Sequence, residues 1–459
     1  MRQHILPFAL AMALSACSLT PALVKPDAPV PVHFPSSNEA DLRANAADLR
    51  WKAVFSDPRL QRLIELALAN NRDLRLAVLN VEAAQAQYGI QRSGQFPAID
   101  VNASAARQRG DSNGTGATTG TQLGLGLGIS AFEIDLFGRT RSLSDAALSR
   151  YLASEQGQKA AQITLIGAVA DSYHAELLAQ EQLKLAQQTL TDWQQSLDLA
   201  RRLKAANQNS GLEVSQAEGQ VATAEADMEA RTRAVSQARN ALQLLVGTAI
   251  PADLPPAPML DDLPRQALPA GLPSDLLTRR PDILQAEHNL RAANADIGAA
   301  RAAFFPRLSL TTSLGYSSSE MGKLFDSGSR VWSFAPQLTV PIFNAGRLRS
   351  ELRLAEVRTS SAVAEYERAI QTAFREVADG LAGRETYGRQ IEAQQRVVAS
   401  AEKRLALSNL RYRAGVDGRL ELLDAQRQLY AARQTLLDLR HGELASTVAL
   451  YKALGGGVS

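Results

Sequence analysis

The sequence predicts a mainly helical protein with a small β part, in which one module occurs twice in tandem. Three observations support this fold class: an internal repeat, two pairs of alternating stretches of strand length, and proline-free segments with heptad spacing. At 459 residues, a chain with one domain per ~150 residues would hold three domains. The repeat favours two copies of one unit instead.

The N-terminus is typical of a secretory signal peptide over residues 1–16. Its apolar run, residues 5–14, is too short to cross a bilayer, and small residues then lead to Cys17. This arrangement resembles the bacterial lipoprotein processing site, and we expect Cys17 to carry a covalent lipid, with no other cofactor. Ser18, where some such lipoproteins have Asp, implies sorting to the outer membrane. An ordinary signal peptide followed by a chance cysteine is the alternative.

The internal repeat aligns residues 71–74 (NRDL) with 280–283 (RPDI), and residues 96–97 (FP) with 305–306 (FP). One gap suffices to align the rest of the two copies, which makes a chance match improbable. The predicted boundaries are 1–16 for the signal peptide, 17–56 for a lipid-anchored extended segment, 57–247 for the first copy, 248–273 for a proline-rich linker and 274–459 for the second copy.

Each copy is predicted to hold the same elements in the same order: a helix, a β-hairpin, a long helix and a last helix. In the first copy the opening helix covers 57–95 and ends before Pro97, which disfavours helix in the residue ahead of it. The hairpins, at 98–134 and 307–342, alternate apolar with small or polar residues over about 10 residues per strand. That is the length of a tilted transmembrane strand, although hairpins of soluble proteins look the same.

The helical segments that follow the hairpins have coiled-coil spacing. The long helix of the first copy is predicted over residues 139–207, which contain no proline. The last helix of each copy repeats its seam every seven residues. The seam positions are Val214, Val221, Met228, Val235 and Leu242 in the first copy, and Leu422, Leu429, Leu436, Glu443 and Leu450 in the second. A free-standing coiled coil would show the same seam but would leave the hairpins unexplained.

Four strands of membrane length cannot close a barrel, because the smallest transmembrane barrels have about 8 strands. An open sheet edge in lipid leaves backbone groups unpaired at a cost of several kcal/mol each. Symmetric association removes the edges: two copies of the chain supply 8 strands and three supply 12. The pattern therefore predicts a ring-shaped oligomer, without fixing the number of copies.

Charge and motifs exclude several function classes. Lys and Arg total 49 and Asp and Glu total 47, so the net charge of +2 argues against a nucleic-acid binder. No stretch reaches the ~18 apolar residues of a membrane-spanning helix. The sequence has no P-loop, no nucleophile elbow and no metal-ligand spacing among its five histidines, so we expect neither an enzyme nor a metal site. Energy for any transport then has to come from a partner.

Several motifs together resemble the TolC-like outer-membrane factor family, and in particular its NodT/OprM-type lipoprotein branch. Besides Cys17 they are residues 70–74 (NNRDL), 272–277 (LPSDLL), 279–283 (RRPDI), 304–306 (FFP), 341–347 (PIFNAGR), 411–415 (RYRAG) and 423–426 (LDAQ). They cover essentially the whole mature chain in order. The resemblance implies a homotrimer in the outer membrane, with a 12-stranded transmembrane β-barrel continued by a 12-helix periplasmic α-barrel.

The resemblance also implies partners and a role. The partners are a periplasmic adaptor protein and an inner-membrane transporter of the resistance-nodulation-division class, beside the outer-membrane lipid. The role is that of a passive exit duct for drugs and other small toxic compounds in a tripartite efflux pump. The exit channel of a type I protein secretion system shares the fold and is the alternative. A structural lipoprotein without a pore is a third possibility, which the paired hairpins disfavour.

In the family the gate lies at the inner end of the tube, and six residues here occupy its positions. They are Tyr412, Gly415, Asp417, Glu421 and Asp424 of the second copy and Glu213 of the first. The i, i+3 spacing of Glu421 and Asp424 puts both acids on one helix face, so threefold symmetry would form two stacked carboxylate rings that favour cations. Asp417 stands where some members have an arginine, and Arg419 follows two residues later. The partner of Tyr412 is left open.

Overall fold

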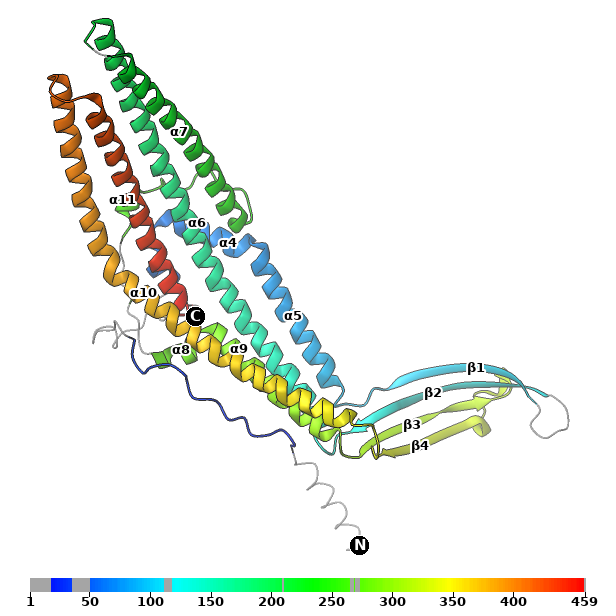
Figure 1. Cartoon of the computed structure of the whole chain (residues 1–459). Coiled ribbons are helices and arrows are strands. Elements are labelled where there is room, and N and C mark those ends of the chain that lie inside the picture. The colour runs from blue at the N-terminus through cyan, green and yellow to red at the C-terminus, as the bar shows by residue number, and fades with distance from the viewer. Residues whose placement is uncertain are drawn as a thin grey trace. The chain divides into compact units, whose positions relative to one another are not determined.

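The chain is represented by a computed structural model that describes residues 18–34, 50–110, 118–208, 210–264, 268 and 273–457 (Figure 1). The predicted signal peptide, residues 1–16, and Cys17 lie outside this part of the chain. The helices are α3 (Trp51–Val54), α4 (Pro58–Asn70), α5 (Arg72–Ser93), α6 (Arg139–Ala205), α7 (Gly211–Val246), α8 (Pro273–Arg279), α9 (Pro281–Ala302), α10 (Arg347–Arg413) and α11 (Arg419–Ala453). The strands are β1 (Asp100–Gly110), β2 (Thr118–Ile134), β3 (Arg307–Ser318) and β4 (Arg330–Thr339). None of the helices in the described part of the chain combines the length and the apolar composition that crossing a bilayer requires.

Contacts divide the chain into two compact units, and each unit takes segments from both halves of the sequence. The first unit contains residues 79–155 and 285–368, with the described N-terminal residues up to Asp27, and so holds β1 to β4. The second contains the described residues of 28–78, 156–284 and 369–459. The helices α6 and α10 have 67 residues each, and each belongs in part to both units.

The first unit contains one antiparallel sheet with the strand order β1-β2-β3-β4 (Figure 1). Residues that lie opposite each other in a sheet share a face, so the register sorts the side chains. One row across the four strands is apolar: Val101, Leu127, Leu314 and Trp332. The adjacent row pairs Gly128 with Ser313 and Ser313 with Ser333, whose hydroxyls lie 2.7 Å apart. One face of the sheet is therefore apolar, and the other carries small and polar residues.

A β-bulge in β2 keeps this division intact along the strand. It lies between Ile129 and Phe132, and Ala131 within it has a φ of +52°. The bulge reverses the odd–even alternation of β2. Ile129 pairs with Thr312 before the bulge and Phe132 pairs with Leu310 after it, so both apolar side chains stay on the same face.

In the second unit the heptad positions of α7 pack against α6. The buried cluster consists of Val214, Ala217, Val221 and Ala224 from α7, with Leu190, Trp193, Leu197 and Ala200 from α6. Alanines at the seam let the two backbones approach closely, and Ala217 and Ala200 are at most 1% exposed. On α11 the seam residues Leu422, Ala425, Leu429 and Ala432 are buried as well. The predicted seams are therefore the packed surfaces of both helical hairpins.

The predicted single helix over residues 57–95 is wrong: the structure breaks it into α4 and α5 at Asn71. The Asn71 side chain donates from Nδ2 to the carbonyl of Leu245 at 2.9 Å and accepts the N–H of Leu74 at 2.9 Å, which caps α5. The break brings the C-terminal end of α7 against the junction, where Gly247 lies beside the carbonyl of Asn70. Local helix propensity did not reveal the break because its cause is this distant helix end.

Gly247 is predicted to be irreplaceable at this junction. Its φ is +75°, and a Cβ there would lie 2.5 Å from the Asn70 carbonyl oxygen. Gly247→Ala is expected to destabilise the protein by about 2 kcal/mol or more, from backbone strain and the clash together. Gly219→Ala, at an exposed position of α7 with nothing within 4 Å, is the matched control and should stabilise by about 0.5–1 kcal/mol. Thermal unfolding followed by circular dichroism measures both; equal shifts would contradict the role of Gly247.

Candidate functional site

The second unit brings together two helix turns, one between α6 and α7 and one between α10 and α11. In the second turn Gly415 has a φ of +69° and donates its N–H to the carbonyl of Tyr412 at 3.0 Å. A residue with a Cβ is strained at this φ, so glycine is required for the chain to reverse here. In the first turn the Ser210 hydroxyl accepts the N–H of Glu213 at 3.3 Å and begins α7. We call these turns and the helical ends beside them the tip.

Tyr412 is 8% exposed, and its hydroxyl donates to Oε2 of Glu213 at 3.3 Å. The two residues come from different halves of the chain: Tyr412 lies near the end of α10, and Glu213 lies in the first turn of α7. This is the partner of Tyr412 that the sequence left open. The hydrogen bond connects the two helical hairpins at the tip.

Arg419 is a residue whose role sequence analysis missed. It is only 2% exposed, and its guanidinium donates from Nη1 to the carbonyl and from Nη2 to Oγ of Ser196 in α6, both at 3.2 Å. Its Cζ also lies 5.9 Å from the ring centre of Tyr412. Arg419 is the first residue of α11, where the helix dipole disfavours a cation. That unfavourable position was the signal in the sequence that another contact must hold this side chain.

Asp417 forms an ion pair across the turn between α10 and α11. Arg411 donates to it from Nε at 2.5 Å and from Nη2 at 2.7 Å, so the pair is bidentate across the turn. These hydrogen bonds hold the pKa of Asp417 below its usual range. Asp417 therefore has a partner six residues earlier in the same hairpin.

Glu421 and Asp424, which we call the aperture acids, lie on one face of α11 as their spacing predicts. Their side chains are 61% and 40% exposed. Arg404 of α10 reaches both, with its Nη2 2.8 Å from Oδ2 of Asp424 and 3.4 Å from Oε2 of Glu421. Gln428 also donates to Asp424 at 3.0 Å. Sequence analysis did not single out Arg404, because it is 17 or more residues away along the chain.

Away from the tip, polar contacts continue between α7 and α11. Gln220 donates to Gln426 at 3.2 Å, and the Tyr430 hydroxyl donates to Asp227. Burial, with this hydrogen bond, raises the pKa of Tyr430 to about 12. Glu213, Gln220 and Asp227 are spaced seven residues apart, so they form one polar stripe along α7. The α6–α7 hairpin is thus apolar inside, whereas α7 and α11 meet through polar contacts, beside the edge-to-face contact of Trp193 in α6 with Tyr430 in α11.

Comparison with known proteins supplies the family. A family model described as outer membrane efflux protein matches residues 63–248 and again residues 272–456. The chain belongs to the outer membrane efflux protein family. The resemblance seen in the motifs, the outer-membrane location and the role in efflux are confirmed.

Relatives of this outer membrane efflux protein match along nearly its whole length. The toluene efflux pump outer membrane protein TtgI of Pseudomonas putida is 48% identical, over 100% of this chain and 99% of that protein. The cation efflux system protein CusC of Escherichia coli is 43% identical, over 99% and 98%. The crystal structure of the open state of the Neisseria gonorrhoeae MtrE outer membrane channel has 41% identity and a TM-score of 0.88, over 96% of this chain and 99% of that one. The mainly helical fold with a small sheet is therefore the fold of these channels.

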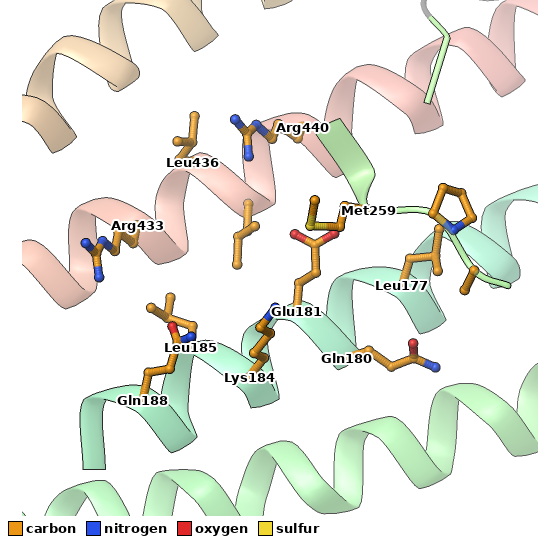
Figure 2. A pocket seen from close by; sticks show the side chains of 13 residues that line it. Leu177, Gln180, Glu181, Lys184, Leu185, Gln188, Met259, Arg433, Leu436 and Arg440 are labelled. Atoms are coloured by element: carbon orange, nitrogen blue, oxygen red, sulfur yellow. The ribbon is translucent and has the colours of Figure 1, made fainter. Parts of the chain in front are cut away.

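A cavity of about 360 Å³ lies in the second unit of this efflux protein, between α6 and α11 (Figure 2). The chain that follows α7 covers it and is fastened at Leu260, whose N–H donates to Oε1 of Glu181 at 2.6 Å. Close by, Arg440 pairs with Asp261 at 2.9 Å. None of the six predicted gate residues lines this cavity. Among the described residues no three His, Cys, Asp or Glu side chains converge where a metal ion could bind.

Asp171 of α6 is a half-buried acid that we predict to destabilise the efflux protein at neutral pH. Burial raises the pKa of its carboxyl from an ordinary 3.8 to about 6, and its Oδ1 has no hydrogen-bond partner among the described residues. Between these two values the folded chain holds a proton that the unfolded chain has lost, so stability falls as the pH rises through this window. Above it the penalty is fully present.

Asp171→Asn is therefore expected to stabilise the protein by about 1 kcal/mol at neutral pH, well below the full shift because the carboxyl is partly exposed. The gain should disappear as the pH is lowered through 6 toward 4. Unfolding temperatures measured across this range provide the test, with Asp192→Asn, an exposed acid of the same helix, as the control. A gain that did not change with pH would contradict the burial argument.

Proposed function

We propose that this protein is the outer-membrane exit duct of a tripartite efflux pump, and that it conducts drugs and other small toxic compounds. The observation that carries the proposal is the two-faced sheet. Its apolar face suits lipid, its face of small and polar residues suits a water-filled lumen, and β1 and β4 are open edges. An antiparallel pairing of β4 with β1 of another copy would satisfy both edges. Three copies would give the 12-stranded barrel and the 12-helix tube that the resemblance implies.

The tandem repeat and its boundaries belong to the same proposal. We infer copies at residues 57–247 and 274–459, joined by a linker at 248–273 and preceded by a lipid-anchored segment at 17–56. Two observations support it: the family model matches twice, and the two halves have the same order of helices and strands. The contact of α7 with Asn71 recurs in kind in the second half, where Arg280 donates to the carbonyl of Ala453 at 2.8 Å.

The proposed partners are a periplasmic adaptor and an inner-membrane transporter of the resistance-nodulation-division class. The sequence contains no nucleotide-binding motif, so the energy has to be supplied from elsewhere. The name of the relative TtgI, a toluene efflux pump outer membrane protein, agrees with a role as one component of a pump. We further propose a lipid on Cys17. The mass of the N-terminal peptide tests it, and an unmodified thiol there would remove the anchor from the proposal.

At the tip we propose a gate. The hydrogen bond between Tyr412 and Glu213 holds the two hairpins together, Gly415 and Asp417 shape the turn, and the aperture acids form carboxylate rings in the trimer. The polar stripe of α7 supports opening between the hairpins rather than within them. Water can replace polar contacts at modest cost, whereas parting the apolar seams would expose hydrophobic surface.

Drug susceptibility of a deletion strain tests the duct. Loss of the protein should raise sensitivity to several unrelated compounds, and expression from a plasmid should restore resistance. Unchanged susceptibility together with lost secretion of one protein would support a type I secretion channel instead. Purified protein should also conduct ions in a planar bilayer. Silence of both the wild type and a variant that lacks the aperture acids would support a scaffold without a pore.

A further inference from the structure

In the described part of the chain, the aperture acids pair with one cation, Arg404. Asp424 has two donors, the Arg404 guanidinium at 2.8 Å and the Gln428 amide at 3.0 Å, whereas Glu421 has one longer contact at 3.4 Å. Arg404 also donates from Nη1 to Gln428. Asp424 is therefore held toward α10, while Glu421 is 61% exposed.

This arrangement has an electrostatic consequence. One guanidinium against two carboxylates leaves the cluster of Arg404, Glu421 and Asp424 with one net negative charge per chain. In a narrow pore, the ring of charge sets which ions enter and how strongly divalent cations block. Arg404 cancels one of the two negative charges that the aperture acids contribute in each chain. It therefore acts on selectivity as directly as the acids do.

We propose that Arg404 is a specificity-determining residue of the aperture, which limits cation preference and divalent block by neutralising Asp424 and leaving Glu421 as the ion-facing acid. This inference rests on the proposed function, because it needs the aperture acids to face the pore. It also assigns the two acids different roles: Glu421 attracts cations, and Asp424 mainly positions the arginine.

Arg404 is suited to this role rather than to holding the fold. Its side chain is 38% exposed, and exposed ion pairs contribute little to stability. The chain offers a matched control in Arg433, which pairs with Glu402 across the same two helices at 2.7 Å with similar exposure, 39% and 48%. Arg433 makes no contact with either aperture acid in the described structure.

The test compares Arg404→Gln, Arg404→Lys and Arg433→Gln with the wild type as full-length trimers in planar bilayers. Two quantities are measured: the reversal potential in a KCl gradient, and the Mg²⁺ concentration that halves the conductance. We expect Arg404→Gln to shift the reversal potential toward cation selectivity and to lower the half-blocking concentration about five-fold, since one positive charge per chain is lost. Arg404→Lys and Arg433→Gln should remain close to the wild type.

The variant Glu421→Gln/Asp424→Asn separates this inference from the proposed function. If the double variant changes block and selectivity while Arg404→Gln does not, the role proposed for Arg404 is wrong. The proposal that the acids form the aperture is then retained. If the double variant changes neither quantity, the acids do not face the pore. In that case the role of Arg404 and the proposed gate both fail. If Arg404→Gln and Arg404→Lys change both quantities alike, loss of side-chain packing rather than charge explains the effect, and the inference is overturned.

Discussion

Neutralising both aperture acids together, by Glu421→Gln and Asp424→Asn, is expected to abolish the cation preference of the proposed pore and to weaken Mg²⁺ block about ten-fold or more. The physical reason is the sign of the net charge that remains at the proposed aperture. With both carboxylates removed, Arg404 is left without its two acidic partners, and the cluster changes from one net negative to one net positive charge in every chain. Reversal potentials in a salt gradient should therefore shift toward anions, and single-channel records with added Mg²⁺ should show fewer closures.

Glu385→Gln is the control for this pair of substitutions. Glu385 is a 55%-exposed acid of α10 that pairs with Arg389, so its loss changes the net charge of the chain without touching the aperture. It should leave block and selectivity as in the wild type. If Glu385→Gln altered block as much as the double substitution, the whole-chain charge rather than a ring at the tip would control cation entry.

Arg280→Ala is expected to have the largest effect on stability, a loss of about 3 kcal/mol. The Arg280 side chain is 7% exposed and pairs with Asp282 at 2.6 Å and with Glu376 at 2.8 Å. It also donates to the carbonyl of Ala453 at the end of α11. Alanine would remove the cation that pairs with both acids and the donor to the carbonyl, and it would leave the space of the guanidinium empty. The unfolding temperature of the purified protein measures the loss.

Two further variants show whether burial is the cause. Arg280→Lys keeps the charge but cannot reach three acceptors, so it should recover only part of the stability. Arg389→Ala removes an arginine that is 69% exposed and should change stability by less than about 0.5 kcal/mol. A loss in Arg389→Ala equal to that in Arg280→Ala would mean that arginine content, not the buried network, sets the stability.

Much of the fold was predictable because periodicity is a local property of the chain. The heptads of α7 and α11 are the buried seams, and the alternating stretches form β1 to β4. The break at Asn71 was not predictable, because it depends on contacts with Leu245 and Gly247, which follow about 175 residues later. Nor could alternation alone reveal that the bulge at Ala131 preserves the apolar face, since that depends on pairing with β3.

The candidate site divides in the same way. The spacing of Glu421 and Asp424 placed both acids on one helix face, and Gly415 at the reversal of the chain followed from its motif. The partners of these residues could not be predicted from the sequence, because they come from other helices. Arg404 of α10 pairs with both acids, and Glu213 of α7 accepts the hydrogen bond of Tyr412. The unfavourable place of Arg419 at a helix N-terminus indicated that another contact holds its side chain. Nothing in the sequence indicated Ser196 as the acceptor.

The sequence by itself determined the family and the mainly helical fold with a small sheet, because both rest on residue types at short, regular spacings. Only the tertiary structure decided which charges meet. The single Arg404 between two acids, the hydrogen bond from Tyr412 to Glu213 and the buried network of Arg280 all join residues distant in sequence. Such contacts depend on how helices pack and on which side chains lose water, and these are properties of the folded chain.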